Sequence, residues 1–74
     1  TQGVRLIQPE TIYLEPSVEL APDVTLWPGV ILRGRTKIGE GSEVGAYSVL
    51  TDTVVEAGVK IKSHTVCDEA YLES

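Results

Sequence analysis

Aliphatic residues recur at every sixth position between residues 14 and 50. The series consists of Leu14, Leu20, Leu26, Leu32, Ile38, Val44 and Leu50. A helix places apolar residues at intervals of three and four, and a half-buried strand alternates apolar with polar residues, so neither element alone gives this period. The period of six indicates a repeat architecture.

A second series lies two positions before the first and is small or β-branched. It consists of Ile12, Val18, Val24, Val30, Thr36, Ser42 and Ser48. Because strand side chains alternate, both series point inward and the residue between them points outward. Turn-forming residues follow each pair, as in Trp27-Pro28-Gly29 and Gly39-Glu40-Gly41. Each hexad is therefore predicted to be a short strand followed by a corner.

Three hexads close one triangular turn, first over residues 14–31 and then over residues 32–49. Leu50 is followed by Val55, a step of five, and another short step precedes Leu72, which predicts tightened corners at Thr51-Asp52 and at Asp68-Glu69-Ala70. The predicted fold class is all-β: a triangular, parallel β-helix built from hexapeptide repeats, with about three and a half coils.

Outward residues one coil apart stack into three columns. The columns are Glu19, Lys37 and Val54; Thr25, Glu43 and Lys60; and Tyr13, Ile31, Val49 and Val66. We expect the first two to be polar, with opposite charges stacked. The third is apolar throughout, which predicts a face packed against another chain. The alternative is that these aliphatic residues are ordinary surface residues of strands, where β-branched side chains are common.

Composition narrows the function classes. The 74 residues carry a net charge of −5, which argues against binding to a nucleic acid or to an anionic membrane surface. Neither a long apolar run nor a signal-peptide pattern is present, and the lone Cys67 excludes an intrachain disulfide. We expect a cytoplasmic protein.

His64 and Cys67 are the residues most open to a catalytic interpretation. His64 falls on a corner that faces outward, and no carboxylate is placed by the sequence to orient it. Cys67 occupies an inward position, where a buried cysteine behaves as a small hydrophobic residue. We therefore assign neither residue a catalytic role.

The sequence predicts neither a phosphate-binding site nor a metal site. Arg33, Arg35 and Lys37 could contact a phosphate, but a surface salt-linked to neighbouring acidic residues is the preferred interpretation. The glycines at 39 and 41 are interpreted as corner residues, because no Lys-Ser/Thr pair or helix follows them. Metal-ligand spacing is lacking among Asp52, Glu56, Asp68 and Glu69. A single Thr-x-Thr at residues 51–53 does not form the stacked column of an ice-binding β-helix.

The hexads have the form [LIV]-[GAED]-x-x-[STAV]-x, and residues 38–43 and 44–49 fit every position. This form resembles the hexapeptide-repeat family, whose coils are left-handed. A narrower match begins at residues 3–16, GVRLIQPETIYLEP, and continues in residues 24–34, VTLWPGVILRG. These stretches resemble the bifunctional N-acetylglucosamine-1-phosphate uridyltransferase/glucosamine-1-phosphate N-acetyltransferase family, at the point where its nucleotidyltransferase domain leads into its β-helix.

The resemblance implies a parent enzyme that uses acetyl-CoA to acetylate glucosamine-1-phosphate, then UTP and Mg²⁺ to make UDP-N-acetylglucosamine for the cell envelope. It also implies a homotrimer of side-by-side β-helices. The family's nucleotide-binding motif would precede this chain and its acetyltransferase residues would follow it, and His64 comes several coils too early to match the catalytic histidine. No residue here therefore inherits a catalytic, cofactor-binding or metal-binding role.

We accordingly interpret residues 1–11 as a segment leading in from a preceding domain and residues 12–74 as the first coils of the β-helix. The chain is then a scaffold and trimer-contact fragment, inactive by itself, with Tyr13, Ile31, Val49 and Val66 as its subunit-packing face. Two alternatives are a free-standing β-helical trimerisation module and the β-helical tail of another sugar-phosphate nucleotidyltransferase.

Overall fold

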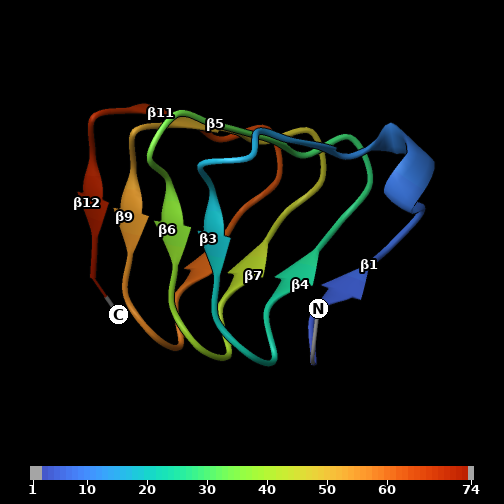
Figure 1. Ribbon diagram of the computed structural model, residues 1–74, viewed down its shortest axis with the longest axis horizontal. Coiled ribbons are helices and arrows are strands. Elements are labelled where there is room, and N and C mark those ends of the chain that lie inside the picture. The colour runs from blue at the N-terminus through green and yellow to red at the C-terminus, as the bar shows by residue number, and fades with distance from the viewer. Residues whose placement is uncertain (1–2, 74) are drawn as a thin grey trace.

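The computed structural model describes residues 3–73, which form a triangular solenoid with one parallel sheet on each side (Figure 1). Sheet A contains β1 (Arg5–Leu6), β4 (Thr25–Leu26), β7 (Glu43–Val44) and β10 (Lys60–Ile61). Sheet B contains β2 (Tyr13–Leu14), β5 (Ile31–Arg33), β8 (Val49–Thr51) and β11 (Val66–Asp68). Sheet C contains β3 (Glu19–Leu20), β6 (Lys37–Ile38), β9 (Val54–Val55) and β12 (Tyr71–Leu72).

The chain visits sheets A, B and C in turn and then repeats the cycle, so every pairing joins strands of successive coils. The four strands of sheet C run side by side across the front of Figure 1, from β3 at one end to β12 at the other. Each pairing is parallel. The predicted all-β, parallel solenoid is therefore confirmed, and it has about four coils.

The register confirms the repeat length and its shortening. Ile31 lies opposite Tyr13 and Val49 lies opposite Ile31, so each of these coils is three full hexads long. Val66 lies opposite Val49, so the next coil is one residue shorter. The short step falls where the sequence predicts it, because Val55 lies opposite Ile38. One residue is lost at a corner without any change in which side chains point inward.

The first coil starts earlier than the sequence predicts. Strand β1 lies in the segment that was expected to lead into the solenoid, and Arg5 is paired with Thr25, a separation longer than three hexads. The 3₁₀ turn η1 (Pro9–Thr11) lies within this longer coil, after Gln8 with φ of 54°. The division of the chain at residue 11 stays a prediction, and residues 1, 2 and 74 lie outside the described part of the chain.

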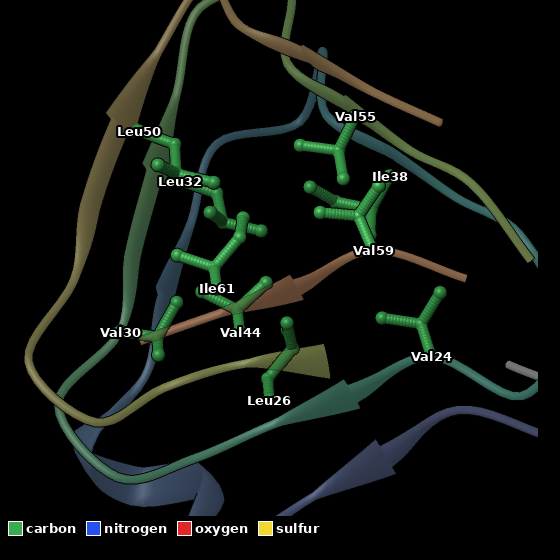
Figure 2. Packing of buried hydrophobic residues seen from close by; sticks show 10 residues of the cluster. All are labelled: Val24, Leu26, Val30, Leu32, Ile38, Val44, Leu50, Val55, Val59 and Ile61. Atoms are coloured by element: carbon green, nitrogen blue, oxygen red, sulfur yellow. The ribbon is translucent and has the colours of Figure 1, made fainter. Parts of the chain in front are cut away.

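The core is a stack of aliphatic side chains from the inner faces of the three sheets, as Figure 2 shows. Its buried members are Val24, Leu26, Val30, Leu32, Ile38, Val44, Leu50, Val55, Val59 and Ile61. The aliphatic positions that define the hexads all point into this interior, although Leu14 and Leu20 of the first coil are only half-buried. Burial of these side chains is the main driving force for this fold.

Hydroxyl groups fill the inward positions that are not aliphatic. Thr36, Ser42, Ser48 and Thr53 are fully buried. The Ser42 hydroxyl donates to the Glu56 carbonyl at 2.6 Å and accepts from the Val59 N–H at 3.1 Å. Among residues 3–73, every buried side-chain nitrogen or oxygen has a hydrogen-bond partner. The hydroxyls of Thr36, Ser42 and Ser48 therefore join successive coils through the interior, whereas that of Thr53 donates to the Thr51 carbonyl of its own coil.

The corners repeat a left-handed backbone conformation at equivalent positions of successive coils. At the corner between sheets A and B this position holds Gly29, Tyr47 and His64, with φ of 77°, 61° and 61°. Hydrogen bonds continue along the corner, since the Tyr47 N–H donates to the Pro28 carbonyl and the His64 N–H donates to the Ala46 carbonyl. Corner side chains one coil apart are thus stacked as regularly as the strand side chains.

Candidate functional site

The apolar column on sheet B has the geometry that the sequence predicts. Tyr13, Ile31, Val49 and Val66 occupy successive, directly paired positions on β2, β5, β8 and β11. Tyr13 is 52% exposed and Val66 is 75% exposed, while the two central residues are half-buried by their neighbours in the sheet. The side chains form a continuous apolar stripe along the full height of this face.

A second outward row flanks the apolar column on sheet B. Arg33 and Asp68 are exposed at the ends of β5 and β11, and Thr51 is half-buried at the end of β8. In the first coil Glu15 follows β2, and its Oε1 accepts a hydrogen bond from the Gly34 N–H at 2.7 Å. Sheet B therefore presents an apolar column beside a column of mostly charged residues.

Aromatic side chains gather at the corner between sheets A and B. Trp27, 39% exposed, donates its indole Nε1–H to Oε2 of Glu43 at 2.7 Å. The rings of Tyr47 and His64 are stacked, with centroids 5.6 Å apart and planes inclined by 17°. The sequence places His64 correctly on an outward corner, and the structure adds its aromatic neighbour.

The sheet C column is less polar than predicted. Tyr71 extends the series Glu19, Lys37 and Val54 by one strand, so the later half of the column consists of two exposed apolar side chains. The Tyr71 hydroxyl donates to Oε2 of Glu56, and this hydrogen bond is the main cause that raises the pKa of Tyr71 above its usual value. The prediction missed Tyr71 because the shortened coil obscured its register.

The corner that carries Arg33 and Arg35 is capped by carboxylates. Acidic side chains in neighbouring coils bind the backbone of this corner: Oδ1 of Asp52 accepts from the Arg35 N–H at 2.9 Å, as Glu15 accepts from Gly34. Both carboxylates thus bind N–H groups of the turn. The expected salt-linked surface around Arg33, Arg35 and Lys37 stays a prediction, and the structure adds this capping of corner N–H groups.

The glycines considered for a phosphate loop are corner residues, as predicted. A Cβ atom at Gly39 would lie 2.5 Å from the backbone nitrogen of Ala57 in the next coil, so the close stacking of corners requires glycine there. Gly41 has φ of 75°, a conformation that glycine adopts easily.

Cys67 occupies the inward position predicted for it but is only half-buried. Together with Val59, Ile61 and Leu72 it lines a hollow of about 450 Å³ at the last described coil. These side chains continue the columns of the core, and the hollow is the open end of the prism. Within residues 3–73, no three His, Cys, Asp or Glu side chains lie together in an arrangement that could hold a metal ion.

The repeat has known counterparts. The family described as bacterial transferase hexapeptide (six repeats) matches residues 17–52. The chain carries bacterial transferase hexapeptide repeats. Its relatives include the bifunctional protein GlmU of Thermus thermophilus, 69% identical over 96% of this chain, and that of Desulfitobacterium hafniense, 42% identical over the same share. A GlmU protein of Kineococcus radiotolerans is 47% identical over 81% of the chain.

These matches confirm the resemblance drawn from the sequence, and with it a hexapeptide-repeat β-helix of the left-handed kind. The chain spans only 16% of the length of the Thermus relative. In the described part of the chain, no helix has the length and apolar character needed to cross a membrane.

Proposed function

We propose that this chain is the scaffold and subunit-contact part of a bifunctional enzyme that makes UDP-N-acetylglucosamine in the cytoplasm. The parent enzyme would transfer an acetyl group from acetyl-CoA to glucosamine-1-phosphate and then a uridylyl group from UTP, with Mg²⁺. The identity of 69% over nearly the whole chain supports this parentage. No residue of the chain is assigned to either reaction.

The observation that carries the contact role is the unbroken apolar column of sheet B. Charged residues interrupt the outward columns of sheets A and C, whereas none interrupts the series from Tyr13 to Val66. Exposed apolar stripes of this kind are typical of surfaces that pack against another protein. Three copies packed side by side through this face would form the homotrimer.

Two lysines in the centre of the face test the proposal. Ile31→Lys combined with Val49→Lys would place two charges in an apolar contact, and we expect sedimentation velocity to show monomers in place of trimers. A matched variant on sheet C, Glu19→Lys with Val54→Lys, adds two lysines outside the face and should stay trimeric. An unchanged trimer in the first variant would contradict the proposed face, provided that circular dichroism shows both variants folded.

A further inference from the structure

We propose that the later half of sheet C binds an extended basic segment of a partner protein, in which an apolar residue lies between two arginines or lysines. The segment would lie on the outward surface of β9 and β12. This surface lies outside the face assigned to the proposed trimer, so the inference does not depend on that proposal. The surface, called the acid-flanked patch, has Val54 and Tyr71 at its centre and Asp52, Glu56, Glu69 and Glu73 at its sides.

Two successive coils repeat one order of outward residues in the patch. Each coil carries an apolar residue with a carboxylate two positions before it and two positions after it: Asp52, Val54 and Glu56, then Glu69, Tyr71 and Glu73. Tyr71 is paired directly with Val54, and the Glu56 N–H donates to the Leu72 carbonyl at 2.9 Å. The two coils are therefore in register, with apolar side chain over apolar side chain and carboxylate over carboxylate.

The centre of the patch is open to solvent. Val54 is 37% exposed and Tyr71 is 57% exposed. The flanking acidic residues are also exposed, except Glu56, which is half-buried. An apolar centre that includes an aromatic ring and is bordered by polar side chains is the common composition of a protein-binding surface.

The charges of the patch are not balanced within the fold, unlike those of the earlier coils. On β3 and β6 the paired residues Glu19 and Lys37 have opposite charges. On the later coils Glu73 instead lies level with Glu56. Residues 63–74 contain neither lysine nor arginine, and Lys37 borders the patch only from the second coil. Like charges stacked on neighbouring strands are unfavourable, and a bound cation would relieve that repulsion.

The negative charge extends over the apolar centre, to the ring of Tyr71. Its hydroxyl donates to Oε2 of Glu56, and this hydrogen bond is the largest cause that raises the pKa of Tyr71. The negative charges of Glu56 and Glu73 raise that pKa further. A guanidinium placed on the face of the ring would therefore be attracted both by the ring and by the carboxylates beside it. Arginine suits this position better than lysine, because its planar group stacks on aromatic rings and binds carboxylates through two N–H groups.

The spacing of the patch defines the shape of its partner. Residues two positions apart in an extended chain point to the same side and are about 6.6 Å apart. An extended segment that runs along β12 would therefore present basic, apolar and basic side chains to Glu69, Tyr71 and Glu73 in turn. Asp52 already accepts a hydrogen bond from the Arg35 N–H, so we assign the segment to the three glutamates of the patch. Charge complementarity of this kind selects a basic partner and disfavours an acidic one.

Peptide binding to the natural polypeptide that carries these residues tests the proposal. The probe is a fluorescently labelled synthetic peptide with one leucine two positions from an arginine on each side, and fluorescence anisotropy measures its dissociation constant. Glu56→Gln combined with Glu73→Gln removes one flank of the patch, and we expect binding to weaken about fivefold. The matched control, Glu10→Gln with Glu19→Gln, removes the same charge from the first coil and should leave binding unchanged. Circular dichroism confirms that both variants are folded.

A second set of measurements tests the apolar centre of the patch. Tyr71→Ala should weaken binding of the peptide about threefold. Tyr47→Ala removes an exposed ring from the corner between sheets A and B and should not change binding. A peptide in which glycine replaces the leucine should also bind about threefold more weakly. Because exposed ion pairs are screened by salt, we expect binding to weaken as the salt concentration rises.

Several results would overturn the proposal. Equal weakening by the two double variants would show attraction by net charge alone. Equal binding of the leucine and glycine peptides, or complete displacement of the leucine peptide by an equal concentration of spermidine, would show a surface that attracts any small cation. Absence of measurable binding to the folded, unaltered protein would also contradict it. None of these results bears on the proposed trimer, which sedimentation measures separately.

Discussion

The ring of Tyr47 lies against Gly29, which holds the same position one coil earlier on the corner between sheets A and B. A Cβ atom at Gly29 would come within 3.2 Å of three carbons of that ring, and Gly29 also has φ of 77°. Glycine is therefore required here twice, once for the backbone conformation and once for the space that the tyrosine occupies.

Alanine at Gly29 should destabilise the protein more than alanine at Gly41. Gly41 has a similar φ of 75° but nothing within 4 Å of its would-be Cβ, so Gly41→Ala carries only the backbone strain, about 1 kcal/mol. Gly29→Ala adds displacement of Tyr47, and we expect a total of about 1–3 kcal/mol. Thermal unfolding of the two variants makes the comparison. Equal losses would show that the Tyr47 ring contributes nothing.

Removal of the Ser42 hydroxyl should weaken the link between the coils. Ser42→Ala leaves the buried Val59 N–H without this acceptor, and an unsatisfied buried group costs about 1–3 kcal/mol. The control is Ser63→Ala, an exposed corner serine, for which the expected change is within about 0.5 kcal/mol. Denaturant unfolding measures both, and similar midpoints would argue against a structural role for the buried hydroxyl.

The Tyr71 hydroxyl should titrate at a pH above the usual pKa of a tyrosine. Its hydrogen bond to Glu56 holds the phenol in its protonated form, which raises its pKa. Ultraviolet titration of Glu56→Gln should therefore show one phenol returning toward its ordinary pKa, and Tyr71→Phe should remove the raised transition. Because the folded pKa is raised, the stabilisation is present below the ordinary pKa, about 10, and is lost as pH rises through the folded value. Identical curves for wild type and Glu56→Gln would refute the assignment.

The isolated 74 residues should catalyse neither acetyl transfer nor uridylyl transfer. Coupled assays for release of CoA and of pyrophosphate measure the two reactions, with the proposed parent enzyme as the positive control. Turnover above background in either assay would place catalytic groups within this chain and overturn the scaffold interpretation.

The hexad period was sufficient to predict the coils, the inward positions and the shortened step after Leu50. Those features follow from side-chain burial, which leaves a direct trace in the sequence. Strand β1 left no such trace. Between β1 and β2 the first coil contains η1 and additional residues, so the period of six does not continue back to Arg5. The first pairing was therefore missed.

The partners of the corner residues could not be predicted for a different reason. Asp52 and Glu15 bind backbone N–H groups of the second coil. Almost every residue has such a group, so the sequence does not show which one a carboxylate will bind. Tyr47 and His64 adopt a left-handed backbone conformation, which a sequence indicates more clearly where the residue is glycine. Tyr47 follows Gly29 by three full hexads, and His64 follows Tyr47 by the shortened coil length. That spacing is the signal that could have placed the two rings in one stacked column.

The ratio of native to denatured mass tests the central claim, that this chain is a side-by-side contact element of a trimer. Sedimentation equilibrium of the natural polypeptide that carries these residues gives the native mass, and mass spectrometry under denaturing conditions gives the mass of one chain. The account predicts a ratio of three that falls to one in the Ile31→Lys, Val49→Lys variant. A ratio of one or two for the wild type would contradict it.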